Sequence, residues 1–158
     1  MPISSGIPAP EFSLADETGA IRSLSEFRGR PVILYFYPKD DTPGCTTEAC
    51  NFRDDYSQYT QAGITILGVS PDSSKSHAKF KTKYGLPFTL LADDGHKICE
   101  VYKVWGTKKN YGREYQGVFR TTFLIDEHGK IIHVFENVKP AGHNVEVLAE
   151  LKQAASNK

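Results

Sequence analysis

An unbroken apolar run at residues 32–37 is the feature that most constrains the fold of this chain. Its sequence, VILYFY, is rich in β-branched and aromatic residues and indicates a strand that is covered on both faces. The run ends at Pro38, and Thr42 and Pro43 then suit the N-cap and the first position of a helix. The pattern therefore predicts a buried strand that leads through a short loop into a helix.

Cys45 falls in the first turn of this expected helix. The unpaired backbone N–H groups and the positive end of the helix dipole favour a thiolate at that position. Most free cysteines are small buried hydrophobes instead, and this alternative applies to Cys45 as well. Two features favour a reactive thiol. Ligand sites of open α/β sheets lie where a strand gives way to a helix, and the residues before Cys45 are small, polar and turn-forming.

The composition is that of an ordinary globular protein. The length of 158 residues suits one domain, residues 1–158. Lys plus Arg and Asp plus Glu are balanced at 19 each, so the charge indicates no nucleic-acid or membrane partner. No apolar run is long enough for a membrane span, and residues 1–6 lack the basic and apolar regions of a signal peptide. With only three cysteines, a cytoplasmic protein is expected, unless a targeting segment has been removed.

Hydrophobic periodicity and turn residues divide the chain into alternating strands and helices. The expected elements are a hairpin (12–23), a strand (32–37), a helix (43–62), a strand (64–70), a helix (about 73–84), a strand (88–91), a helix around Ile98 and Tyr102, a polar surface excursion (106–116), a hairpin (118–125 and 131–135) and a helix from Asn144. This order predicts an α/β protein with a mixed central β-sheet and helices on both faces. It is the pattern of a thioredoxin-like fold with an N-terminal β-hairpin extension and a central insertion.

Two of these helices have a defined inward face. The first is expected to face the sheet with a single stripe of residues at helical spacing: Cys45, Ala49, Phe52, Tyr56 and Tyr59. The second is expected to pack through Ala78, Phe80 and Tyr84. Cys45 therefore lies on the side of its helix that faces the core.

Arg120 is the one charge in the expected apolar strand at residues 118–125. An unpaired buried charge is costly, so the guanidinium needs an anion or strong acceptors. One interpretation points Arg120 at the sulfur of Cys45, where it would lower the thiol pKa and donate hydrogen bonds to a bound oxygen. The other lets the side chain reach solvent from the start of the strand, which is common for arginine. Composition alone does not decide between them.

The spacing of Pro38, three residues, Thr42, two residues and Cys45 resembles the active-site pattern of the peroxiredoxins. Residues 120–126, RTTFLID, resemble the strand that carries the active-site arginine of that family. Three further features resemble the peroxiredoxin Q group, also called bacterioferritin comigratory proteins: Cys50, the VWG segment at 104–106 and the PAPEF segment at 8–12. The likeness spans nearly the whole chain.

This resemblance implies a thiol-dependent peroxidase of hydrogen peroxide and organic hydroperoxides that acts in antioxidant defence. Cys45 would be the peroxidatic thiolate, which is oxidised to sulfenic acid. The hydroxyl of Thr42 would interact with sulfur and peroxide, and Pro38 would shield the sulfur from water. Arg120 would stabilise the charge that moves to the departing oxygen. Glu48 also recurs in the family; here it could orient an arginine, or it could be only an acid that is favourable near the start of the helix.

The resemblance also implies that Cys50 resolves the sulfenic acid by forming an intramolecular disulfide with Cys45. Thioredoxin, or alternatively glutaredoxin, would then reduce this disulfide. The protein is expected to be a monomer. Cys50 could instead be a packed helix residue, and Cys99 is expected to be a bystander in or near the core. The five histidines show no metal-ligand spacing, so neither metal nor cofactor is expected.

Two other functions compete with the peroxidase. A thiol–disulfide oxidoreductase on the same fold usually carries a C-x-x-C motif, whereas four residues separate Cys45 from Cys50. A binding module would use the fold only as a scaffold, and its Cys45 would have unremarkable reactivity.

Overall fold

The computed structural model describes residues 1–156. The strands are β1 (Ser13–Asp16), β2 (Ile21–Ser23), β3 (Val32–Phe36), β4 (Thr65–Ser70), β5 (Thr89–Ala92), β6 (Trp105–Asn110), β7 (Arg113–Val118), β8 (Thr121–Ile125) and β9 (Ile131–Phe135). The helices are the 3-10 helix η1 (Leu24–Phe27) and the α-helices α1 (Pro43–Asp54), α2 (Tyr56–Gln61), α3 (Ser74–Tyr84), α4 (Lys97–Val101) and α5 (His143–Ser156).

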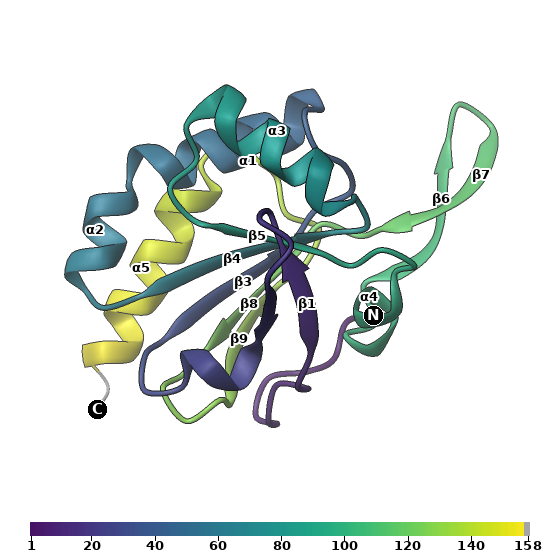
Figure 1. Cartoon of the computed structure of the whole chain (residues 1–158). Coiled ribbons are helices and arrows are strands. Elements are labelled where there is room, and N and C mark those ends of the chain that lie inside the picture. Colours follow the sequence, from purple (N-terminus) through teal and green to yellow (C-terminus); the bar gives the residue numbers. More distant parts are fainter. Residues whose placement is uncertain (157–158) are drawn as a thin grey trace.

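A seven-stranded sheet forms the centre of the molecule, in the order β2-β1-β5-β4-β3-β8-β9 (Figure 1). Strands β3, β4 and β5 run parallel, whereas β8, β9 and the β1–β2 hairpin pair antiparallel. The mixed sheet and the N-terminal hairpin extension are therefore confirmed. The hairpin joins the sheet because β1 pairs with β5.

The apolar run at the centre of the sequence is the central strand β3, and it is buried on both faces as predicted. Its alternate side chains enter two separate hydrophobic clusters. Ile33, Tyr35 and the following Tyr37 face one cluster, whereas Val32, Leu34 and Phe36 face the other. None of the six is more than 2% exposed. This strand therefore fixes the two halves of the core to each other.

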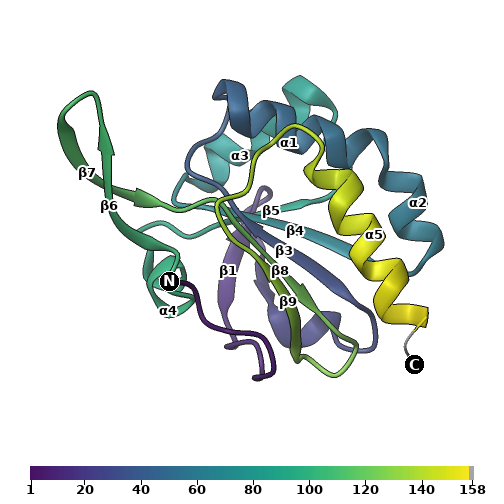
Figure 2. The same cartoon turned by 180° about the vertical axis from the view of Figure 1, so that it is seen from behind.

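The helices divide unequally between the two faces. Successive parallel crossovers β3–α1–β4 and β4–α3–β5 move in one direction along the sheet, so their right-handed geometry places α1 and α3 on the same face. Phe52, Phe80 and Val147 bring α1, α3 and α5 into one cluster there. The opposite face is covered by η1, α4 and the N-terminal segment, as the two opposite views show (Figures 1 and 2). Helices on both faces are therefore confirmed.

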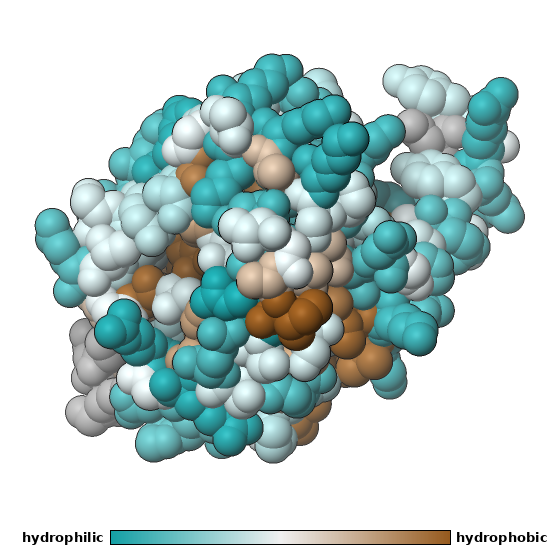
Figure 3. Space-filling model, viewed as in Figure 1, coloured by the Kyte–Doolittle hydropathy of each residue, from teal (hydrophilic) through white to brown (hydrophobic). Residues whose placement is uncertain are grey.

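The surface around this core is mainly hydrophilic on the face drawn in Figure 3, with apolar residues in small areas. Over the described residues 1–156, no helix combines the length and the apolar character that a membrane crossing requires.

Three expected elements are wrong in detail. The helix predicted as far as residue 62 is broken at Asp55, which leaves helical geometry (φ −99°, ψ 8°) and accepts a hydrogen bond from Asn144 Nδ2 at 2.5 Å. The expected surface excursion at 106–116 is the β6–β7 hairpin, which projects from the body (Figure 1). Its turn residues Tyr111 and Gly112 both have positive φ, 50° and 77°, as a two-residue type I′ turn requires.

The expected strand at 118–125 is also divided. Val118 ends β7, Phe119 and Arg120 lie between strands, and β8 begins at Thr121. In α3, His77 rather than Ala78 points inward, because residues 77, 80 and 84 share the inner face of the helix. His77 is fully buried, and Ser73 caps this helix through its Oγ, which accepts from Ser76 N at 3.1 Å.

Candidate active site

The start of α1 lies directly beyond the end of β3, as predicted. Thr42 has the extended backbone of an N-cap (φ −96°, ψ 156°), and its carbonyl accepts from Thr46 N at 2.8 Å. Its side chain does not cap the helix, because the hydroxyl donates instead to the carbonyl oxygen of Lys39 at 2.9 Å. Pro43 occupies the first turn, where a missing N–H costs nothing.

Cys45 is buried in this first turn, with 2% of its surface exposed. The guanidinium of Arg120 donates from Nη2 to the sulfur of Cys45 at 3.2 Å and from Nη1 to Glu48 Oε1 at 2.8 Å. Only 17% of the Arg120 side chain is exposed, so the interpretation in which it extends to solvent is wrong. Although burial opposes the charge of Arg120, Glu48 and Cys45 together raise its pKa above the ordinary value. The single guanidinium of Arg120 therefore donates hydrogen bonds to two acidic groups, the Cys45 sulfur and the Glu48 carboxyl.

Glu48, which accepts from Arg120, is buried, with only 1% of its surface exposed. Burial raises the pKa of its carboxyl to about 7, because desolvation outweighs the attraction of Arg120. Its Oε2 has no hydrogen-bond partner, and neither has the buried hydroxyl of Tyr35. Burial, followed by the negative charges at Glu48 and Cys45, raises the pKa of Tyr35 well above its ordinary range. Both oxygens are therefore buried polar atoms without a hydrogen-bond partner among the described residues.

The neighbouring backbone holds Arg120 and α1 together. The carbonyl of Arg120 accepts from Val138 N at 3.0 Å. At Gly44, a Cβ atom would lie 3.2 Å from Arg120 Nη2 and 3.4 Å from Pro140 Cγ, so a larger residue would push against the guanidinium. Asn51 donates from Nδ2 to the carbonyl of Pro140 at 3.3 Å. The sequence prediction missed Gly44, although a glycine directly before a first-turn cysteine is a signal of close approach.

The remaining predicted site residues lie in the same loop and helix. Pro38 and Thr42 are half-buried on either side of the loop that leads to Cys45, and Cys50 is half-buried in α1, five residues further on. Cys99 is fully buried in α4, within the cluster on the opposite face of the sheet. Burial and the nearby Asp93 carboxylate raise the pKa of its thiol far above the ordinary value. The structure therefore brings together Cys45, Arg120 and Glu48 and separates them from Cys99.

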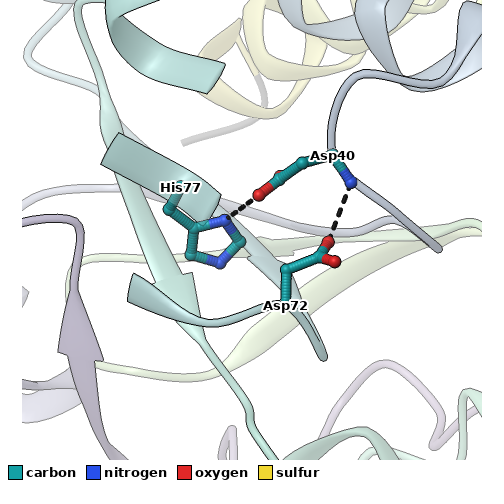
Figure 4. A group of neighbouring side chains, drawn as sticks. All are labelled: Asp40, Asp72 and His77. Atoms are coloured by element: carbon teal, nitrogen blue, oxygen red, sulfur yellow. Dashed lines mark hydrogen bonds and ion pairs between the residues drawn. The ribbon is translucent and has the colours of Figure 1, made fainter. Parts of the chain in front are cut away.

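The structure also assembles a polar group that sequence analysis missed. Ligand atoms of Asp40, Asp72 and His77 lie within 4.8 Å of one another, next to the Cys45 loop (Figure 4). Such a set could hold a metal ion, but each of its members is already engaged in hydrogen bonds with the protein. The helical spacing of residues 77, 80 and 84 is the signal that could have placed His77 inside.

Comparisons with known proteins agree with this arrangement. The model of the AhpC/TSA family matches residues 5–134. The putative peroxiredoxin bcp of Coxiella burnetii is 53% identical over 151 residues, which covers 96% of this chain and 100% of the relative. Peroxiredoxin Bcp of Bacillus subtilis is 49% identical over 152 residues, a match that covers 96% of this chain and 97% of the relative.

Solved structures give the same result. A cysteine-to-serine mutant of Xanthomonas campestris peroxiredoxin Q superposes with a TM-score of 0.89 at 37% identity, over 96% of this chain and 99% of that chain. The bacterioferritin comigratory protein of the same organism was solved to study its alkyl peroxide reduction activity. That structure also superposes with a TM-score of 0.89 at 37% identity, over 96% of this chain and 99% of that chain. Among the functions considered, these relatives favour the peroxidase. Because the family model covers most of the chain and the relatives match almost its whole length, this protein belongs to the AhpC/TSA family and is a peroxiredoxin, a peroxidase that works through cysteine chemistry.

Proposed function

We propose that Cys45 is the peroxidatic thiol of this enzyme. The observation that carries the proposal is the contact of 3.2 Å between Arg120 Nη2 and the Cys45 sulfur in the first turn of α1. In the reaction, the thiolate attacks one oxygen of the peroxide, the O–O bond breaks, and Cys45 becomes a sulfenic acid. The other oxygen leaves as hydroxide or alkoxide and takes up a proton to become water or an alcohol.

Arg120, Thr42 and Pro38 would assist this step. Negative charge moves from sulfur to the departing oxygen, and the guanidinium of Arg120 and the N–H of Cys45 are donors that can follow it. The hydroxyl of Thr42 donates to Lys39, which leaves its oxygen free to accept the peroxide proton. Pro38 contributes apolar surface and no N–H next to the sulfur. Together these groups would orient the peroxide for attack in line with its O–O bond.

Cys50 would then resolve the sulfenic acid as a disulfide. Both cysteines belong to α1, where five residues give a Cα separation of about 9 Å in a regular helix. A disulfide requires Cα atoms within about 7 Å and facing Cβ atoms. The first turns of α1 must therefore unwind in each cycle, which the half-buried position of Cys50 favours because little core is lost.

We further propose that thioredoxin reduces this disulfide, with glutaredoxin as the alternative donor. Resolution within one chain needs no second subunit, which supports a monomer acting as a single domain, residues 1–158. A cytoplasmic location fits because free cysteines persist in a reducing compartment. Hydrogen peroxide and organic hydroperoxides are the expected substrates, and a peroxide panel with the two donors compared side by side tests substrate and donor together.

Cys45→Ser is expected to abolish peroxide turnover and to leave the fold intact, because it removes the nucleophile without changing side-chain volume much. The measurement is hydrogen peroxide consumption with a thioredoxin-reducing system. Cys99→Ser is the matched control and should retain turnover, since Cys99 is buried on the opposite face. Substantial turnover by Cys45→Ser, together with its loss in Cys99→Ser, would move the nucleophile to Cys99.

Arg120→Ala is expected to slow the peroxide step about 10²- to 10³-fold, because one charged donor at such a site contributes roughly 2.7–4 kcal/mol of barrier lowering. Stopped-flow measurement of the first peroxide equivalent gives the rate, and Arg113→Ala, at an exposed position of β7, is the control. An unchanged second-order rate in Arg120→Ala would contradict the role given to the guanidinium.

Cys50→Ser is expected to reduce one equivalent of peroxide at the normal rate and then to stall as sulfenic acid when thioredoxin is the donor. Mass spectrometry after a single equivalent should detect the sulfenic acid, whereas the wild type should show a disulfide between residues 45 and 50. Normal cycling by Cys50→Ser would show that another thiol resolves the intermediate.

Glu48→Gln is expected to change how stability depends on pH. Since the pKa of Glu48 is raised from 4.5 to about 7, the folded state holds this proton where the unfolded state releases it. That contribution is present below pH 4.5 and is lost as the pH rises through 7. The wild type should therefore lose about 3 kcal/mol of unfolding free energy relative to Glu48→Gln between pH 4 and 8. Denaturant titrations measure this, with Glu114→Gln on the exposed hairpin as the control; parallel pH profiles would contradict it.

A further inference from the structure

A buried hydrogen-bond network centred on Asp40 lies in the catalytic loop, residues 38–42, and the reaction described above does not use it. The Asp40 carboxylate accepts from Tyr37 Oη at 2.6 Å, from Ser76 Oγ at 2.8 Å and from His77 Nδ1 at 2.7 Å. Asp40 is 8% exposed and His77 is fully buried. Three donors from the end of β3 and from α3 therefore converge on one carboxylate of the loop.

Both ring nitrogens of His77 are hydrogen-bonded in the interior. Nε2 lies 2.9 Å from the carbonyl oxygen of Leu91, which can only accept, so Nε2 carries a hydrogen. Nδ1 faces the Asp40 carboxylate, so a proton lies between these atoms as well (Figure 4). Separating the two side chains in the interior is costly, because each would be left as a buried polar group without its partner.

The loop backbone is held by the same network. Asp40 N donates to Asp72 Oδ2 at 2.8 Å (Figure 4). Ser70 Oγ donates to the same oxygen at 2.7 Å. The next residue, Asp41, has a left-handed backbone (φ 57°) and accepts from Lys83 Nζ at 2.7 Å and Tyr84 Oη at 2.6 Å. Asp40 therefore contacts the first turn of α3, and Asp41 contacts the last.

We propose that Asp40 and His77 are positioning residues of the peroxide step, and that they stay paired while α1 unwinds for the disulfide. The inference rests on the proposed function of Cys45 and Cys50. The pair fixes the loop that presents Pro38 and Thr42 to Cys45. The bonds of the loop to α3 end at Asp41, and the next hydrogen bond to α3 comes from Arg53 Nη1, near the end of α1, to the Tyr84 carbonyl at 2.7 Å. Unwinding is therefore expected between these two anchors.

The first test measures the single-turnover reduction of one peroxide equivalent by Asp40→Asn, His77→Gln and the double variant. Each single variant should react about 10- to 100-fold more slowly than the wild type, because small displacements of orienting groups have effects of this size. The double variant should be no slower than the slower single one, since the two residues act as a pair. His128→Gln, at an exposed histidine, is the control. Rates within about twofold of the wild type, or additive losses, would overturn the proposal.

The second test needs no variant and covers the case in which a substitution prevents folding. Amide hydrogen exchange is compared in the reduced and disulfide forms of the wild type. Exchange should rise at residues 43–52 on oxidation and stay unchanged at residues 38–41 and in the first turn of α3. A merely structural pair would not set this boundary. Equal increases in both regions would show that the pair separates in each cycle and would overturn the proposal.

These outcomes are distinct from failure of the proposed function. If Cys45→Ser keeps peroxide turnover, the assignment of Cys45 fails whatever the loop does. If the wild type reduces peroxide through Cys45 while Asp40→Asn and His77→Gln react at the wild-type rate, only the positioning role fails.

Discussion

The proposed active site depends above all on one guanidinium, which donates hydrogen bonds to two buried acids. Arg120 donates to the Cys45 sulfur and to Glu48, and its single positive charge cannot fully balance both as anions. Burial favours the neutral form of Glu48 and raises its pKa to about 7. When Glu48 carries its proton, the charge of Arg120 is left to the sulfur, and a thiolate at Cys45 is stabilised more strongly. The carboxyl that holds the guanidinium in place therefore also competes with the Cys45 sulfur for its positive charge.

This contact requires a backbone that leaves the sheet in the right place. Arg120 lies between β7 and β8, where its side chain reaches the start of α1, and the Val138 N–H fixes its carbonyl. A continuous strand through this position would alternate its side chains between the two faces of the sheet. The interruption thus lets a residue from one end of the β6–β7 hairpin reach a cysteine that lies 75 residues earlier in the chain.

The fold, and the cysteine that we propose as the nucleophile, could be predicted from the sequence because both depend on local signals. The apolar run of β3 and the spacing of Pro38, Thr42 and Cys45 are readable within a few residues. What could not be predicted depends on contacts between distant segments: Glu48 beneath Arg120, the Thr42 hydroxyl bonded to Lys39, and His77 paired with Asp40 across 37 residues. The β6–β7 hairpin was missed for another reason, since its polar strands bury little and resemble a loop in composition.

The two steps proposed for this enzyme require opposite properties of α1. Attack on peroxide requires an ordered start of the helix, whereas disulfide formation requires the helix to unwind. The loop before α1 supplies the order, and the residues after Cys45 allow the unwinding. Attack on peroxide needs a fixed first turn, and the loop before it is held by buried bonds to Asp40. Disulfide formation needs the following turns to open, and there the helix is weak. Thr46 and Thr47 are poor helix formers, by up to about 0.7 kcal/mol each relative to alanine. The Thr47 hydroxyl also bonds back to the Pro43 carbonyl at 3.0 Å, a contact that slightly destabilises helices. The hydrogen bonds that hold the loop therefore end just before the part of α1 with weak helical propensity. The helix can unwind around Cys45 while the loop that positions this residue stays in place.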